Sequence, residues 1–238
     1  MKIAIMQPYL FPYIGYFSLI KNTDHFVFFD TPQYIRKGWI NRNRITGEAV
    51  FFTIPVQKAK RETPINKIMI SQNENWKMKI LGQLNVYKRA PYYNEVIQLV
   101  NDTLGIQTSS ISDMAIASIV KTCEYLGIHM KSDVFSEMNL RIPNVNAPDE
   151  WALYITKESG YDTYVNPPGG RSFFDPEKYK KHNIDLQFLE QEIVPYRQKG
   201  KEFIPALSII DVMMFCSKDQ IASMLRQYQI RRSCIEQV

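Results

Sequence analysis

A turn rich in proline, glycine and aromatic residues follows the first apolar segment of the chain. Residues 7–17 read QPYLFPYIGYF, directly after a predicted strand at residues 2–6. Ligands of parallel α/β sheets bind beyond the carboxyl ends of the strands, so this turn stands where a ligand is expected. Tyrosine can stack on a base or a sugar while its hydroxyl forms one hydrogen bond. The predicted ligand-contacting residues of this turn are Gln7, Tyr13, Gly15 and Tyr16.

A second group interleaves amide, guanidinium and aromatic side chains after a predicted strand at residues 25–30. Asp30 is placed at the carboxyl end of that strand. Such a mixture is typical of a surface that binds sugar hydroxyls and phosphates. A structural loop and a nucleic-acid-binding surface are the alternatives, and the slightly acidic remainder of the chain argues against nucleic acid. The predicted binding residues are Gln33, Tyr34, Trp39, Asn41, Arg42 and Asn43.

A third turn, YVNPPGGR at residues 164–171, again follows a predicted strand. Paired glycines free the backbone to direct N–H groups at an anion, and the arginine adds positive charge. The same residues also make an ordinary tight turn. The predicted contacts are Asn166, Gly169, Gly170 and Arg171. These groups can form a single pocket only if three segments converge at one edge of the sheet. The segments are this turn, the aromatic turn at residues 7–17 and residues 30–44, which we call the Asn/Arg segment.

A fourth candidate group is Ser208 and Asp211, within the apolar segment IPALSIIDVMMF. A carboxylate in such a segment is costly unless it is paired. Asp211 is therefore expected either to pair with an arginine such as Arg42 or to accept a proton from a substrate amine. Ser-x-x-Asp before an apolar run is also a helix-capping pattern, which is the structural alternative.

Several common catalytic and cofactor-binding patterns are missing from the sequence. It contains no P-loop, no GxGxxG and no GxSxG motif, and its three histidines are too scattered for zinc-binding spacing, so no metal is predicted. Cys216 is expected in the core beside two methionines. The three cysteines lack CxxC spacing, and no signal-peptide pattern or run of roughly 20 apolar residues occurs. These features predict a cytoplasmic protein without a transmembrane segment.

The positive charge is concentrated in one segment. The 238 residues carry a net charge of +5, whereas residues 31–61 alone carry seven cations against Glu48, a local charge of +6. The remainder of the chain therefore sums to −1. This concentration indicates an anionic ligand, such as a diphosphate, or an anionic surface, while a solvated loop is the alternative.

Apolar patterning predicts strands that alternate with helices. Expected strands are residues 2–6, 25–30, 51–56, 65–71, 129–136, 162–167 and 184–190, and expected helices are residues 15–21, 76–90, 94–104, 110–128, 148–159, 176–183 and 204–216. This order implies an α/β fold with a mostly parallel, Rossmann-like sheet and helices on both faces. We predict a single α/β domain over residues 1–238, with residues 31–75 as a β-rich insertion or flap and residues 217–238 as a C-terminal helical tail.

The aromatic turn resembles the nucleotidyltransferase superfamily. Tyr13-Ile14-Gly15-Tyr16 stands where those enzymes carry His-x-Gly-His, and residues 207–211 (LSIID) correspond to the turn that holds their triphosphate. Tyrosine cannot become cationic, so the resemblance implies the fold and leaves the phosphate chemistry in question.

The chain as a whole resembles the WbqC-like family. The resemblance is carried by MQPYLFPYIGYFSLI, DHFVFFDTPQY, GWINRNRI, TIPV, VNPPGG and LSIIDVMMF, which occur in this order between residue 1 and about residue 216. It implies a role in the biosynthesis of bacterial O-antigen or surface polysaccharide. The expected substrate is a nucleotide-linked amino sugar that receives an acyl or aminoacyl group.

The leading functional hypothesis is transfer of an acyl or aminoacyl group to the amine of a nucleotide-diphosphate sugar. Asp30 or Asp211 would serve as the base, and Tyr16 completes the predicted catalytic set. Arg42 and the paired glycines would hold the diphosphate. No cofactor is certain, and the donor would be an acyl thioester of CoA or of an acyl carrier protein, or ATP would activate the acyl group. The alternatives are an adenylate-forming or nucleotidyl transferase and a non-catalytic sugar-nucleotide-binding protein.

Overall fold

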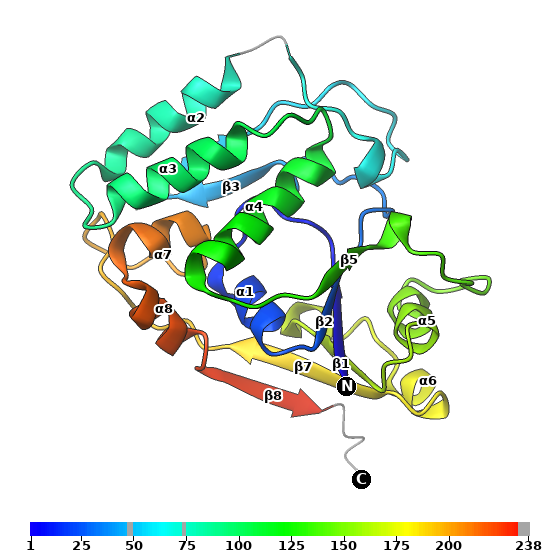
Figure 1. Ribbon diagram of the computed structural model, residues 1–238. Coiled ribbons are helices and arrows are strands. Elements are labelled where there is room, and N and C mark those ends of the chain that lie inside the picture. Colours follow the sequence, from blue (N-terminus) through cyan, green and yellow to red (C-terminus); the bar gives the residue numbers. More distant parts are fainter. Residues whose placement is uncertain (47–49, 73–74, 233–238) are drawn as a thin grey trace.

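The computed structural model describes residues 1–46, 50–72 and 75–232, and its centre is a six-stranded sheet (Figure 1). The strands are β1 (Lys2–Met6), β2 (His25–Phe28), β5 (Ser132–Val134), β6 (Thr163–Asn166), β7 (Asp185–Gln191) and β8 (Tyr228–Arg232). They lie in the order β5-β2-β1-β6-β7-β8. All neighbouring pairs are parallel except β7 and β8. The predicted α/β class with a mostly parallel sheet is confirmed.

The strand order places a crevice at one edge of the sheet. The chain builds outward from β1 to β2 and β5, and then returns to the other side of β1 to add β6 and β7. Such a reversal is a topological switch point, and in open α/β sheets ligands bind outside the carboxyl ends of the strands there. The switch point of this sheet lies between β1 and β6.

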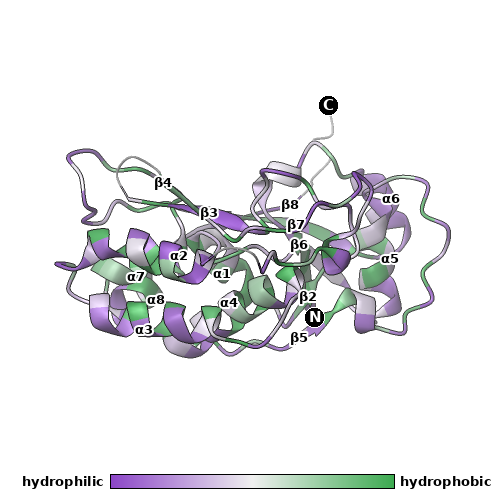
Figure 2. Ribbon diagram, turned by 90° about the horizontal axis from the view of Figure 1, so that it is seen from above, coloured by the Kyte–Doolittle hydropathy of each residue, from purple (hydrophilic) through white to green (hydrophobic). Residues whose placement is uncertain are grey.

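Helices cover both faces of the sheet, as the sequence predicts. The α-helices of the described residues are α1 (Ile14–Lys21), α2 (Trp76–Leu84), α3 (Tyr93–Leu104), α4 (Ile111–Leu126), α5 (Glu150–Glu158), α6 (Pro176–Lys181), α7 (Ile209–Phe215) and α8 (Lys218–Met224). Figure 2 shows α5 and α6 on one side of the sheet and α1, α4, α7 and α8 on the other. The central strand β1 therefore buries both of its faces: Ala4 belongs to one apolar cluster, and Ile3 and Ile5 belong to the other.

Local signals set the bounds of α4. The Ser110 side chain accepts a hydrogen bond from the amide of Asp113 at the N-terminus. Gly127 ends the helix in the left-handed conformation, with φ of 65°. Both features follow the sequence prediction, because capping depends on residues within one turn of the helix end.

Residues 31–75 contain a separate two-stranded antiparallel sheet, formed by β3 (Arg42–Ile45) and β4 (Val50–Thr53). The strand predicted at residues 65–71 is wrong. Ile65–Lys67 form a short 3₁₀ turn, η1, and the following residues make only isolated bridges to Val56 and Ser110. Pro64 precedes this turn in an extended conformation, which suits the start of a turn.

Two predictions for the C-terminal third also need correction. The helix expected from residue 204 begins only at Ile209, because Ala206 has a positive φ of 54° and Ser208 caps α7. The predicted helical tail contains α8 and then β8, which pairs antiparallel with β7 at the sheet edge. Glu48 and residues 233–238 lie outside the described residues.

Candidate functional site

A pocket of about 830 Å³ lies at the carboxyl edge of the sheet, at the switch point. We call it the switch-point pocket. Its wall comes from the ends of β1, β2 and β6, from the following loops and from the N-terminal part of α5. Aromatic rings and neutral amides dominate the wall, which includes Gln7, Phe29, Gln33, Trp151, Asn166 and Phe173. Such a lining suits a ring-bearing ligand that also offers hydroxyl or carbonyl groups.

A second pocket, of about 920 Å³, adjoins the first. Gln33 and Ile35 line both, so the two pockets are neighbours that share part of one wall. Five cations line this second pocket, which we call the cationic pocket: Arg36, Lys37, Lys58, Lys60 and Arg61. None of the described residues that line it is an aspartate or glutamate. Cations concentrated around a cleft raise the local concentration of anions.

The two loops of the cationic pocket are joined by hydrogen bonds. The Arg36 guanidinium donates to the carbonyl of Ala59 at 3.0 Å. The amide of Tyr34 donates to the carbonyl of Thr63 at 2.9 Å. Cations that are 20 or more residues apart in sequence are therefore held around one space, and their mutual repulsion makes that space favourable for an anion.

The aromatic N-terminal turn contributes fewer site residues than the sequence predicts. Gln7 lines the switch-point pocket, as does the neighbouring Tyr9. The Tyr13 ring packs against Gly15, where a β-carbon would lie 2.4 Å from the ring, so this glycine permits a close approach. Tyr16 is 1% exposed and donates its hydroxyl to the carbonyl of Gln7 at 2.9 Å. The predicted catalytic role of Tyr16 is therefore not supported, because its hydroxyl is buried and bonded.

Substitution Tyr16→Phe tests this structural role. It removes one buried hydrogen bond, so we expect the free energy of unfolding to fall by about 1 kcal/mol. Ligand affinity and any turnover should stay at the wild-type level, measured by calorimetry and by product formation. A loss of turnover of about tenfold or more in a folded variant would restore the catalytic role.

Asp30 lies behind the wall of the switch-point pocket. It stands between Phe29 and Thr31, which both line the pocket, yet it is only 2% exposed. Its carboxylate accepts hydrogen bonds from the backbone amide and the hydroxyl of Ser136, at 3.0 and 2.6 Å. In this arrangement the carboxylate ties the end of β2 to the loop after β5. A role as a base requires it to leave Ser136, so that role stays a proposal.

Asp211 is fully buried within α7, and its partners differ from the expected arginine. The hydroxyls of Tyr87 and Tyr196 donate to its two carboxylate oxygens, and the amide of Thr46 donates at 3.3 Å. Burial raises the pKa of Asp211, and the two tyrosine hydrogen bonds oppose that shift. The predicted contact with Arg42 is wrong. Neither Asp211 nor Asp30 lines either pocket.

Ser208 has a structural role as the cap of α7. Its hydroxyl donates to the carbonyl of Phe11 at 2.7 Å and accepts from the amide of Ile210. The side chain is fully buried. The structural alternative for the Ser-x-x-Asp pattern therefore fits the observed contacts better than ligand binding.

The Asn/Arg segment divides between core and surface. Asn41 donates to the carbonyl of Ile54, and Asn43 donates to those of Leu10 and Phe11, so both amides hold the second sheet in place. Arg42 lies 4.2 Å over the ring of Phe51. Trp39 is 40% exposed and stacks on the same ring. None of these predicted ligand contacts lines the two pockets, because the two amides bond backbone carbonyls and Arg42 and Trp39 lie against Phe51.

The turn at residues 164–171, with its paired glycines, contributes the side chain of one predicted residue to the switch-point pocket. Asn166 lines the pocket and accepts a hydrogen bond from the Tyr164 hydroxyl at 3.0 Å, which fixes its orientation. At Gly170 a β-carbon would lie 2.3 Å from the Asn166 amide nitrogen, so this glycine is required by close packing. Gly169 and Arg171 do not line either pocket. The expected convergence is thus partial: it holds for Gln7, Gln33 and Asn166.

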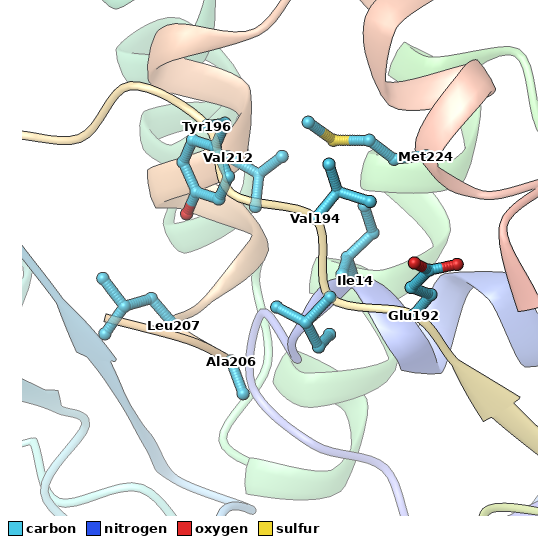
Figure 3. A pocket seen from close by; sticks show the side chains of 9 residues that line it. Ile14, Glu192, Val194, Tyr196, Ala206, Leu207, Val212 and Met224 are labelled. Carbon is cyan, nitrogen blue, oxygen red and sulfur yellow. The ribbon is translucent and has the colours of Figure 1, made fainter. Parts of the chain in front are cut away.

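A much smaller cavity lies beside α7, and Figure 3 shows the side chains around it. Its volume is about 10 Å³, and its wall includes Ile14, Tyr196, Leu207 and Val212. A volume of this size accommodates one water molecule at most. We interpret it as a packing void and not as a ligand site.

Sequence reasoning missed most of the aromatic wall of the site. Trp151, Phe173 and Phe174 come from α5 and from the loop after β6, where isolated aromatic residues read as core. Lys58, Lys60 and Arg61 were visible only as part of the charged segment, and their density was the signal for an anion site.

Comparison with known proteins places the chain in a family. The sequence profile of the WbqC-like protein family matches residues 7–223. The chain belongs to this family. A relative named "Uncharacterized protein Rv1507c", from Mycobacterium tuberculosis, is 27% identical over 217 residues, which cover 89% of this WbqC-like chain and 92% of the relative. No solved structure matches.

The described part of this WbqC-like protein has neither a candidate metal cluster nor a membrane-spanning helix. Residues 1–46, 50–72 and 75–232 hold no cluster of three histidine, cysteine, aspartate or glutamate side chains arranged to bind a metal. No helix within those ranges has the length and apolar character needed to cross a bilayer.

Proposed function

We propose that the protein binds a nucleotide-diphosphate sugar across the two adjoining pockets and transfers an acyl or aminoacyl group to the amine of that sugar. The observation that supports this most is the junction of an aromatic pocket with a cationic one through Gln33 and Ile35. A nucleotide sugar is complementary to this pair of pockets, because its ring systems suit aromatic side chains and the diphosphate that joins them suits cations. The proposed setting is the biosynthesis of a bacterial O-antigen or other surface polysaccharide.

Each part of the ligand has a complementary part of the site. Trp151 and Phe173 offer ring faces for a sugar or a base. The amides of Gln7 and Asn166 can bind hydroxyl and carbonyl groups, because an amide both donates and accepts. The diphosphate would lie in the cationic pocket, where Arg61 and the lysines provide charge-assisted hydrogen bonds.

The proposed reaction needs no enzyme nucleophile. The sugar amine attacks the carbonyl carbon of an acyl thioester, a C–N bond forms, and the C–S bond breaks to release the thiol. The ammonium proton must pass to a base, and proximity in a closed site supplies much of the acceleration. Asp30 stands behind Phe29 and Thr31 and is the proposed base, provided that ligand binding releases it from Ser136.

Non-catalytic binding of a sugar nucleotide is the second candidate, and one observation favours it. None of the described residues that line the two pockets is an aspartate, glutamate, histidine or cysteine. A site without these side chains has few groups that can exchange protons near neutral pH. The two candidates share the ligand and differ only in turnover.

A thermal-shift screen tests the proposed ligand. The panel should hold a nucleotide-diphosphate amino sugar, the nucleoside diphosphate alone, ATP and an acyl-CoA. At a concentration of 100 times Kd the ligand should stabilise the fold by about 2.7 kcal/mol. The proposal fails if the amino sugar nucleotide produces no shift, and a shift with ATP alone would favour nucleotidyl or adenylate chemistry.

An assay of amide formation then separates an enzyme from a binding protein. The protein, the amino sugar nucleotide and an acyl thioester are incubated, and the acylated sugar is detected by mass spectrometry. Asp30→Asn should abolish formation of the amide while leaving sugar-nucleotide affinity close to the wild-type value. Wild-type protein that binds the sugar nucleotide but yields no amide from any donor would support the non-catalytic candidate.

A further inference from the structure

A second basic pocket, of about 400 Å³, lies away from the two pockets described above. It is formed by the turn after α2 and by the segment that leads into α7, which lie side by side in Figure 1. Its cations are Lys88, Arg89, Arg197 and Lys199. Outside residues 31–61 the chain has a net charge of −1, so general basicity does not explain four cations in one place.

A buried clamp holds the two basic segments together. Tyr87, which precedes Lys88 in sequence, donates its hydroxyl to one oxygen of Asp211. Tyr196, which precedes Arg197, donates to the other oxygen at 2.7 Å. The single carboxylate therefore joins segments that are more than 100 residues apart. This contact holds the backbone of the two segments side by side, while the cationic side chains themselves are exposed.

A hydrogen bond from Lys199 provides a second link between the two basic segments. The Lys199 ammonium donates to the carbonyl of Val86 at 3.2 Å and so bridges the same two segments. The ring of Phe215 packs edge-on against that of Tyr87 and closes one side of the pocket. The wall is thus formed by defined contacts between packed elements.

The cations of this pocket have no carboxylate partner among the described residues. No aspartate or glutamate lines the pocket, and none of the ion pairs within residues 1–46, 50–72 and 75–232 involves these four side chains. Like charges held together raise the free energy of the folded state unless an anion neutralises them. A multiply charged anion bound among these four cations would relieve their mutual repulsion.

We propose that this second basic pocket binds a polyphosphate group, either free or carried by a nucleotide, as a site separate from the sugar-nucleotide site. A chain of two or three phosphates presents enough oxygens to contact four cations at once, and arginine and lysine bind such oxygens strongly. The volume falls within the range of small-molecule sites. The site does not depend on the function proposed for the other two pockets.

Isothermal titration calorimetry at physiological salt tests this site, with sodium tripolyphosphate and ATP as separate probes. The cationic pocket is expected to bind tripolyphosphate as well, so wild-type protein should bind two equivalents. Lys88→Gln/Arg197→Gln should lose one of them, with affinity at that site reduced about 100-fold. Lys58→Gln/Arg61→Gln should lose the other, and Arg226→Gln should retain both.

The outcomes separate this site from the sugar-nucleotide site. Lys88→Gln/Arg197→Gln should keep the wild-type affinity for the sugar nucleotide, and its melting temperature without ligand should equal or exceed that of the wild type, because the substitutions relieve repulsion between like charges. ATP that binds more tightly than tripolyphosphate would identify a nucleotide as the source of the phosphates, and equal affinity would identify free polyphosphate. A wild-type stoichiometry of one that survives Lys88→Gln/Arg197→Gln would overturn the proposal, as would no binding by wild-type protein at physiological salt.

Discussion

Asp211→Ala is expected to lower the free energy of unfolding by about 3 kcal/mol. The substitution leaves the hydroxyls of Tyr87 and Tyr196 without their acceptor, whereas the amide of Thr46 keeps its hydrogen bond to the Tyr87 hydroxyl at 2.8 Å. Each unsatisfied buried polar group costs about 1–3 kcal/mol. The variant no longer has to bury a carboxylate, and this gain offsets part of the loss. Urea unfolding, followed by circular dichroism, measures the effect.

Glu202→Ala is the matched control, because Glu202 is an exposed acidic residue. It should change the free energy of unfolding by no more than about 0.5 kcal/mol. If Asp211→Ala kept wild-type stability and lost only turnover, the residue would regain the catalytic role that the sequence suggests. The predicted destabilisation follows from the clamp alone and requires no ligand.

The pH dependence of stability gives a second readout of the clamp. Burial raises the pKa of Asp211 above its ordinary value of 3.8, so the folded protein keeps this proton where the unfolded chain has lost it. The contribution of Asp211 to stability is therefore complete below the unfolded-state pKa and falls as pH rises through the folded-state pKa. Asp211→Asn should remove this component, and unfolding measured across acidic pH would reveal the difference.

Neutralising two cations of the cationic pocket is expected to weaken sugar-nucleotide binding about 100-fold. Lys58→Gln/Arg61→Gln removes two charge-assisted contacts to the proposed diphosphate, and because both side chains are exposed each contact is taken at the low end of its range, about 1.5 kcal/mol, which together give a loss of roughly 100-fold. The affinity of the wild type should also fall with added salt more steeply than that of the double variant. Calorimetric titration at two salt concentrations measures both effects.

The matched control neutralises two exposed cations outside the pockets, Lys157 and Arg226. Lys157→Gln/Arg226→Gln has the same net charge as the pocket variant, so it separates a local contact from the general field of the protein. Equal losses of affinity in both variants would show that the cationic pocket holds no phosphate. An effect confined to Lys58→Gln/Arg61→Gln would support the proposed ligand orientation.

Elements with local signals were predictable from sequence. The helix at α4 follows from its apolar spacing, from Ser110 at its start and from Gly127 at its end, because each of these signals acts on the backbone within one helical turn. The strand at β1 and the sheet class follow from short apolar runs alternating with amphipathic ones. The concentration of cations in residues 31–61 likewise indicated a basic surface, because charge density is visible without coordinates, and five of these cations line the cationic pocket.

The members of the site depended on contacts between distant segments. Arg42 and Arg61 are equivalent in a charge count, yet Arg42 stacks on Phe51 and Arg61 lines the cationic pocket. The sequence also indicated that Asp211 needs a partner, because a lone buried carboxylate is costly. Its actual partners include Tyr87, 124 residues away, and no local pattern encodes that pairing.

The sequence by itself determined the fold class, the ends of α4 and the presence of a basic segment, because short-range propensity and composition govern them. Only the tertiary structure decided which side chains share a pocket, since strand order and packing bring residues together irrespective of their separation along the chain. Gln7, Gln33 and Asn166 meet at one rim because β1, β2 and β6 end there. Lys88 and Arg197 meet because one buried carboxylate joins the tyrosines beside them.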